Sequence, residues 1–415
     1  MDNSNLNDTG YLRIFATTEG EVYPIKVARI EISSTGEPNR ILEVLTTNES
    51  GNSETIPLDA PPLEYSMSPS DNQPYSEYNI KITAPNYEEQ IITGVQILSG
   101  ETGVQNVQMI PSPEGQSIYN PTVISGHTLW EYYPPKIAEA EVKPVNESGE
   151  IVLRKVVVPE TIVVHDGVPS DPTATNYYVP YLDYIKNVAC SEIYSTWPTS
   201  TIEANVLAIM SFTLNRVFTE WYRNKGYNFT ITSSTAYDHK WIKGKTIYEN
   251  VSQIVDYLYA SYLARPNIKQ PILTQYCDGK RVTCPNWMSQ WGSKALGDDG
   301  LSSTDIIRYY YGSDMYVNTA EIISGIPASY PGYDLNIGAS GDAVLQIQEQ
   351  LNRIADNFPA IPKISVDGIY GQGTANSVRE FQRIFDMPVS GIVDYPTWYK
   401  ISQIYVGVSK IAENV

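Results

Sequence analysis

One carboxylate in this sequence, Glu192, stands where an acid could be held for chemistry. The apolar periodicity of VPYLDYIKNVACSEI predicts a helix over residues 179–193. Counting back from Glu192 in helical turns, Val188, Ile185 and Leu182 fall on the same face, so the carboxylate projects from an apolar stripe. A carboxylic acid removed from water can keep its proton at neutral pH, as a general acid must. The simpler alternative is a Glu at a helix end that pairs with a basic side chain.

The segments on either side of this acid must position it. Trp197 and Pro198 break the chain after Glu192, and Ser200 with Glu203 has the spacing of a capping box that begins a second helix. Further along, NWMSQWGSKALGDDGLSSTDIIRYYYG joins a polar, aromatic loop to another amphipathic helix. We expect the corner and the second helix to hold Glu192 against one wall of a pocket.

Composition limits the partners and the architecture. With 415 residues, of which 42% are hydrophobic, the chain is large enough for several separate cores. Its 47 acidic and 28 basic residues give a formal net charge of -19, which repels phosphate backbones, so no nucleic acid is expected as a partner. The polar start MDNSNLNDTG lacks the pattern of a classical signal peptide, and no apolar run predicts a membrane span.

Four units are predicted along the chain. Residues 1–110 alternate short β-type runs with turn residues, hold 16 acidic and 5 basic side chains, and predict an all-β sandwich. Their pattern resembles the transthyretin-type modules of carboxypeptidase regulatory domains, which carry no chemistry of their own. Residues 111–155 are a linker rich in Pro, Ser, Gly and Asn, residues 156–325 mix helices and strands in an α+β domain, and residues 334–402 predict three helices.

The C-terminal unit contains an internal repeat. VDGIYGQGT is echoed by VSGIVDYPT, which aligns Gly368 with Gly391 and Thr374 with Thr397. Together with GDAVLQIQEQL, these segments resemble the peptidoglycan-binding domain found beside many wall-degrading catalytic domains. That resemblance implies a peptidoglycan partner, although the glycines also serve tight turns. The implied wall-binding loop consists of Asp367, Gly368, Tyr370 and Gly371.

The central unit resembles a catalytic family. SEIYSTWPTSTIEANVLAI and MSQWG are similar to the domain of the stage II sporulation protein D type, a lytic transglycosylase of bacterial peptidoglycan. This resemblance implies that Glu192 is the single catalytic acid. The implied substrate cleft contains Ser289, Gln290 and Trp291, and we place Trp197 and Tyr276 beside them.

Over most of its length the chain is similar to the germination-specific spore cortex-lytic enzymes of clostridial type. That family has the same order of units, so the resemblance implies a spore protein that acts on cortex glycan and is stored as a zymogen. It also implies an activating partner, a subtilisin-like germination protease. The implied cut falls near GEIVLRKVVVPE, which leaves a mature protein that begins around residue 150.

A lytic transglycosylase explains why one carboxylate could suffice. Hydrolytic glycosidases use two carboxyl groups, whereas here the substrate's own C6 hydroxyl would replace water. Asp183 lies off the Glu192 face, and Asp238 and Glu203 cannot be placed from the sequence. We therefore expect products that end in 1,6-anhydromuramic acid.

The cysteines leave several alternatives open. Cys277 and Cys284 flank the pair Asp278 and Gly279, which predicts a hairpin turn, so a disulfide, two free thiols or half of a zinc site would fit. Zinc needs four ligands and only His239 could assist, so we expect no metal and no other cofactor. Cys190 is expected to pack rather than to react.

Two other functions stay open from the sequence. The stretch Cys284–Trp287 replaces the H-G-V-G of the sporulation family, so the protein could be a wall-binding or structural spore protein without catalytic activity. A lysin delivered by a phage-tail-type particle would also explain the polar N-terminus.

Overall fold

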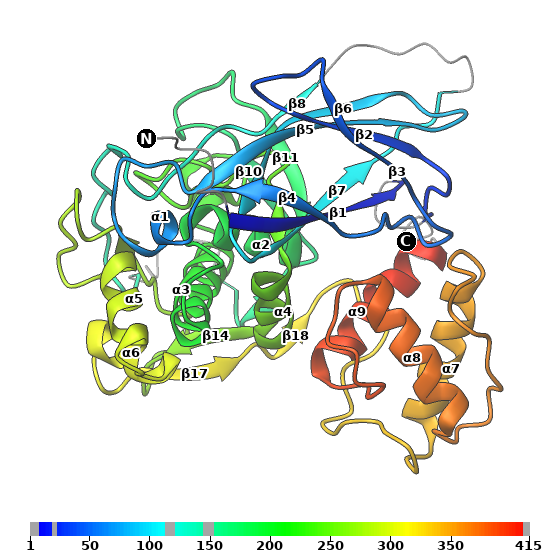
Figure 1. The fold of residues 1–415 in the computed structure, drawn as a ribbon. Helices are drawn as coiled ribbons and strands as arrows, with labels where there is room; N and C mark the ends of the chain where they lie inside the picture. Colours follow the sequence, from blue (N-terminus) through cyan, green and yellow to red (C-terminus); the bar gives the residue numbers. More distant parts are fainter. Residues whose placement is uncertain (1–7, 19–22, 113–120, 144–152, 410–415) are drawn as a thin grey trace.

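The computed structural model describes residues 8–18, 23–112, 121–143 and 153–409. Figure 1 shows the N-terminal strands lying over a central group of helices, while the C-terminal helices α7, α8 and α9 stand to one side. The protein is therefore multidomain, with several sheets and a helical C-terminal region, as the sequence predicts.

The strands are β1 Asp8–Thr17, β2 Arg29–Ser34, β3 Ile41–Thr46, β4 Ile56–Ala60, β5 Tyr75–Thr83, β6 Gln90–Leu98, β7 Thr102–Gln108, β8 Thr122–Val123, β9 Val157–Val158, β10 Thr161–His165, β11 Asn176–Pro180, β12 Ile231–Thr232, β13 Ile247–Tyr248, β14 Ser261–Ala264, β15 Tyr276–Cys277, β16 Met288–Ser289, β17 Tyr316–Thr319 and β18 Ile322–Ile323. The helices are α1 Glu64–Met67, α2 Tyr181–Glu192, α3 Thr199–Phe218, the short 3-10 helix η2 Arg223–Lys225, α4 Glu249–Leu258, α5 Gln290–Asp298, α6 Ser303–Tyr311, α7 Asp342–Ala355, α8 Gln372–Ile384 and α9 Tyr395–Ser409.

The N-terminal strands form two sheets around an apolar core. One sheet has the order β13-β7-β1-β4 and the other the order β3-β2-β5-β6-β8. Alternating side chains such as Ile30 and Ile32, opposite Ile82 and Ile80, are fully buried because residues two apart share a face of a strand. Since β8 and β13 lie outside residues 1–110, the linker and the central region complete this sandwich.

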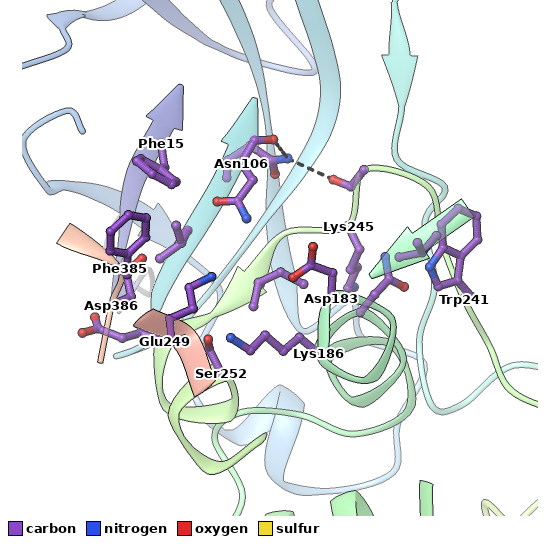
Figure 2. A pocket seen from close by; sticks show the side chains of 17 residues that line it. Phe15, Asn106, Asp183, Lys186, Trp241, Lys245, Glu249, Ser252, Phe385 and Asp386 are labelled. Atoms are coloured by element: carbon purple, nitrogen blue, oxygen red, sulfur yellow. Dashed lines mark hydrogen bonds between the residues drawn. The ribbon is translucent and has the colours of Figure 1, made fainter. Parts of the chain in front are cut away.

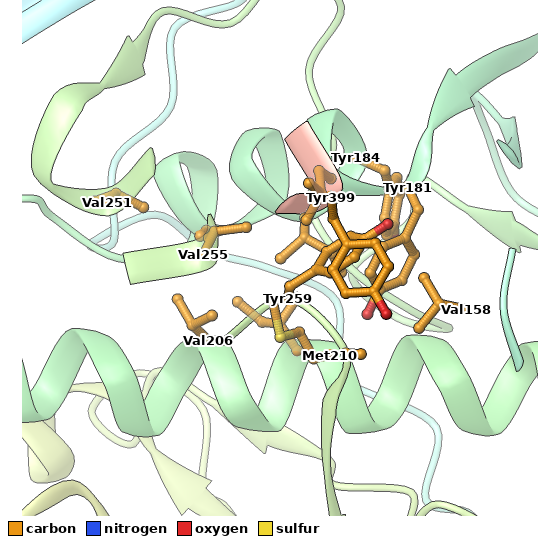
Figure 3. Packing of buried hydrophobic residues seen from close by; sticks show 14 of the residues in the cluster. Val158, Tyr181, Tyr184, Val206, Met210, Val251, Val255, Tyr259 and Tyr399 are labelled. Carbon is orange, nitrogen blue, oxygen red and sulfur yellow. The ribbon is translucent and has the colours of Figure 1, made fainter. Parts of the chain in front are cut away.

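Helix α3 is the axis of the central core. All its residues from Ala204 to Phe218 are buried, which is typical of a helix that is surrounded on every side. Figure 3 shows Val206 and Met210 of this helix near Val255 of α4 and Tyr259, the residue that follows α4. Residues of α2, α4, α5 and α6 pack around α3, so these helices hold one another in place.

Two local expectations from the sequence are wrong. The capping box does not form, because α3 begins at Thr199 behind Pro198, which puts Ser200 inside the first turn, and no side chain caps the helix. Asp278 and Gly279 do not turn a hairpin either. Instead β15 pairs in parallel with β16, and the residues between these strands form a loop.

The C-terminal domain packs as the periodicity of its helices predicts. Val344, Ile347, Leu351 and Ile354 of α7 are fully buried, and Phe381 of α8 completes the same core. No helix in the described part of the chain is both long and apolar enough to cross a membrane.

This domain docks on the rest of the molecule through its α8–α9 corner. Arg13 of β1 forms an ion pair with Asp386, and the rings of Phe15 and Phe385 meet edge to face with centroids 6.2 Å apart. A cavity of about 220 Å³ lies at this junction, and Figure 2 shows the two Phe rings on one side of it and Trp241 on the other. Its lining shares no residue with the pocket that contains Glu192.

Candidate active site

Glu192 is the last residue of α2 and lies in the apolar environment that the periodicity predicts. Val188 and Ile185 on the same face are fully buried, and Glu192 itself is only 7% exposed. The Lys240 backbone N–H donates to Glu192 Oε1 at 2.6 Å, and the Gln290 side chain donates to Oε2 at 2.9 Å. Gln290 also donates to the Glu192 backbone carbonyl at 2.7 Å, so both ends of the Glu are fixed by one amide.

The Glu192 carboxylate faces a small pocket with a cavity of about 40 Å³. Binding sites for organic ligands are commonly roughly 300–1,000 Å³, so this cavity has room for a few water molecules and not for a sugar. The pocket is lined by two sets of residues. The first comes from the linker: His127, Leu129, Tyr133, Pro134 and Lys136. The second comes from the central domain: Glu192, Thr235, Tyr276, Cys277, Asp278, Val282 and Gln290.

The groups around Glu192 are electrostatically coupled to it. Burial and the charge of Glu192 raise the pKa of Tyr276 well above its usual value, so its hydroxyl keeps its proton. Burial lowers the pKa of Lys136, although the charges of Glu192 and Asp238 oppose that effect. The Lys136 ammonium lies 4.3 Å from the centre of the Tyr276 ring and donates to the Asp238 backbone carbonyl. The site therefore combines an acid, a phenol and a cation.

Asp278 is a second carboxyl group in this pocket, and its place in the site was not apparent from the sequence. Its Oδ1 accepts hydrogen bonds from the backbone N–H groups of Lys280 and Val282 at 2.7 and 2.9 Å. Its Oδ2 is buried and has no hydrogen-bond partner in the described structure. The sequence signal was the Asp-Gly pair, which we interpreted only as a turn.

The other carboxylates considered from the sequence have different surroundings. Asp238 is fully buried and accepts hydrogen bonds from Arg216 and Tyr222, so it anchors the fold. Asp183 lines the junction cavity instead of the Glu192 pocket. Glu203 is the fifth residue of α3 and does not line the Glu192 pocket.

The predicted cleft residues take different roles. Gln290 and Tyr276 line the pocket, whereas Ser289 caps α5 by accepting a hydrogen bond from the Gly292 N–H at 2.9 Å. Trp197 and Trp291 lie beside the pocket with ring centroids 4.9 Å apart. The Trp197 indole N–H donates to Ser66 of α1, so the sandwich covers this aromatic pair.

Cys277 and Cys284 form a disulfide that closes the loop carrying Asp278. Cys190 is buried, and burial raises the pKa of its thiol to about 11. His239 is fully buried, and its Nδ1 lies 3.0 Å from the Tyr184 hydroxyl. Among the described residues, no three His, Cys, Asp or Glu side chains gather into a metal site.

In the C-terminal domain, two glutamines build equivalent loops. Gln348 accepts hydrogen bonds from the Asp367 and Gly368 N–H groups and donates to the Ile369 carbonyl and the Thr374 hydroxyl. The second repeat has the same four bonds, made by Gln382 to Ser390, Gly391, Ile392 and Thr397. The sequence repeat is therefore a repeated hydrogen-bonding unit.

The predicted wall-binding loop contains both exposed and buried residues. Asp367 is exposed and Gly371 is half-buried, whereas Gly368 is buried and has φ +71°, a conformation that favours glycine. Tyr370 is fully buried and its hydroxyl donates to the Gly391 carbonyl at 3.0 Å. The Tyr370 side chain therefore links the two loops inside the domain, and wall binding by this loop stays a prediction.

One comparison with known proteins matches the C-terminal domain. Residues 340–401 match the family model described as "Putative peptidoglycan binding domain". No curated protein matches the chain. The crystal structure of the SleB N-terminal domain is 27% identical over 19% of this chain and 99% of its own, with a TM-score of 0.17. The minor pilin GBS52 of Streptococcus agalactiae is 14% identical over 28% of this chain and 50% of its own, with a TM-score of 0.19.

The C-terminal domain is thus a peptidoglycan-binding domain, and the chain is a multidomain protein with a cell-wall-related function and a glycan partner.

Proposed function

We propose that this protein is a lytic transglycosylase that cleaves the bond between muramic acid and glucosamine in peptidoglycan, with Glu192 as its acid and base. The observation that supports this most directly is the Glu192 carboxylate itself, buried at the end of α2 and fixed by Lys240 and Gln290. The presence of a peptidoglycan-binding domain supports peptidoglycan as the substrate. The resemblance of the central segments to the sporulation family supports the same reaction.

In the proposed reaction Glu192 acts twice. It first donates its proton to the glycosidic oxygen, and the bond from that oxygen to C1 of muramic acid breaks. The glucosamine leaves with the proton. The Glu192 carboxylate then accepts the proton of the C6 hydroxyl while O6 forms a bond to C1, which yields the 1,6-anhydro product and restores the acid. The amide of Gln290 keeps the carboxylate in one orientation throughout.

A hydrolase is the second candidate, because Asp278 lines the same pocket with one oxygen unpartnered. In that case Glu192 would be the acid and Asp278 would activate water or attack C1.

Mass spectrometry of digested peptidoglycan separates these candidates. The transglycosylase yields 1,6-anhydromuramic ends, which are lighter by one water than the reducing ends of a hydrolase. Reducing ends alone, together with their loss in Asp278→Asn, would establish the hydrolase. Anhydro ends that persist in Asp278→Asn would support the transglycosylase.

We further propose that the protein is a spore enzyme that acts on cortex during germination and is activated by a subtilisin-like protease. The resemblance to cortex-lytic enzymes supports this setting. The expected cut near residues 149–160 falls partly outside the described residues, which resume at Leu153. Turbidity loss of purified cortex, measured before and after limited proteolysis, tests the zymogen. Equal rates would contradict it, and no release by either form would favour a wall-binding protein without catalysis.

A further inference from the structure

The linker does not merely connect the sandwich with the central domain, because residues between His127 and Lys136 line the Glu192 pocket. The His127 N–H donates to the Tyr75 hydroxyl of the sandwich at 2.8 Å. Two residues later, the Leu129 N–H donates to the Tyr194 hydroxyl at 2.9 Å, and the Leu129 carbonyl accepts from the Trp291 indole at 3.2 Å. The linker backbone thus forms hydrogen bonds with Tyr194 and Trp291, two aromatic side chains beside Glu192.

Beyond the pocket the linker is held as an extended peptide. The Gln275 side chain accepts from the Glu139 N–H at 2.9 Å and donates to the Ile137 carbonyl at 2.8 Å. The Glu141 carbonyl accepts from the Leu273 N–H at 2.9 Å. The Gln270 side chain likewise accepts a hydrogen bond from the Lys143 N–H and donates one to the Lys143 carbonyl. Contacts at every second residue are the mode in which proteins bind extended peptides.

Two carboxylates of this peptide meet two arginines. Glu139 pairs with Arg216 through both oxygens, at 2.6 and 3.0 Å, and Glu141 pairs with Arg265 at 2.7 and 3.0 Å. Arg216 is 1% exposed. Burial would raise the pKa of Glu139, but the hydrogen bonds and charges of Arg216 and Lys143 together hold that pKa below its usual value. We call the surface that holds this peptide, formed by Arg216, Arg265, Gln270 and Gln275, the linker groove. This groove pairs with carboxylates two residues apart, which in an extended chain lie about 7 Å apart.

We propose that this groove is a subsite for the acidic peptide stems that muramic acid carries in peptidoglycan, and that residues 127–143 occupy it as an internal substitute that closes the Glu192 pocket. The proposal rests on the proposed function, because it places a stem of the substrate beside the bond to be cut. It also explains the 40 Å³ cavity, which leaves no room for a sugar until the linker moves. A chain break after Lys143 would leave the linker attached to the sandwich, so displacement of residues 127–143 is the activating event.

The first test uses the full-length chain and removes the two carboxylates of the linker. Glu139→Gln with Glu141→Gln weakens the docked linker, so release of glycan from uncut protein should rise by about tenfold or more. The matched control, Glu43→Gln with Glu54→Gln, removes two exposed carboxylates of the sandwich and should leave release unchanged. Equal release by wild type and the linker variant, with both folded by circular dichroism and with proteolysis still activating them, would overturn the proposal while leaving the proposed function intact.

The second test needs no enzymatic activity, so it still applies if the proposed function fails. Hydrogen exchange of residues 127–143 is followed in the full-length double variant with N-acetylmuramyl-L-alanyl-γ-D-glutamyl-L-lysine, either with both carboxylates free or with both amidated. The free acid should increase exchange of the linker, the amidated probe should not, and Arg265→Gln should abolish the difference. No effect of either probe, or the same effect of both, would overturn the subsite.

Discussion

The peptidoglycan-binding domain and the Glu192 pocket are assembled over very different distances along the chain. In the C-terminal domain, Gln348 bonds Gly368 across 20 positions and Gln382 bonds Gly391 across 9. In the pocket, Glu192 and Gln290 are 98 positions apart. The linker that covers Glu192 contacts Trp291 across 162 positions. A binding domain that is built from local contacts can be identified from a short sequence motif. A catalytic pocket forms only when distant parts of the chain fold together.

The largest expected effect is a loss of catalysis without any loss of wall binding. Glu192→Gln keeps the shape of the side chain but removes the transferable proton, so glycan release by the activated protein should fall by about 10²–10⁴-fold. Binding to insoluble peptidoglycan should be unchanged, because residues 340–401 do not contribute to the pocket. Release rates and a pelleting assay on the same preparation measure both. Near-normal release would mean that the acid is another residue.

A smaller effect is expected from the group that positions Glu192. Gln290→Ala leaves the Glu192 carbonyl and one carboxylate oxygen without this donor, so kcat should fall by about tenfold to a hundredfold. KM should change little if Gln290 orients the acid instead of binding glycan. The exposed Gln372→Ala serves as the control and should match wild type. A rise in KM at constant kcat would instead make Gln290 a substrate contact.

The same kind of substitution in the C-terminal domain should have the opposite pattern. Gln348→Ala or Gln382→Ala leaves loop N–H groups unsatisfied, at a cost of about 1–3 kcal/mol for each buried group. Wall binding and the melting temperature of this domain should drop, while cleavage of soluble glycan by the activated protein persists. Loss of both activities in these variants would show that the two regions are not independent.

The smallest effect concerns the pH dependence of the stability of the sandwich. Burial raises the pKa of Glu101, between β6 and β7, from 4.5 to about 7. The folded state binds this proton more tightly, so the stabilisation is complete below pH 4.5 and is lost as pH rises through about 7. Glu101→Gln should therefore raise the melting temperature of the sandwich at pH 8 and leave it unchanged at pH 4. An equal shift at both pH values would contradict this origin.

Much of the architecture could be predicted because it depends on periodicity. The stripe of Ile185 and Val188 correctly predicted that Glu192 is buried, and the α7 stripe predicted the C-terminal core. The failures came where tertiary contacts override local signals. The Asp278–Gly279 pair has turn chemistry, yet its loop is held by the parallel pairing of β15 with β16.

The sequence by itself determined the repeat of the C-terminal domain and the burial of Glu192, because each depends on residues that are close together in the chain. Only the tertiary structure decided what surrounds Glu192. Asp278, Lys136 and the linker reach it from positions far away in the chain, and no local pattern encodes which carboxylates and cations meet after folding. The pocket and its cover are products of long-range packing.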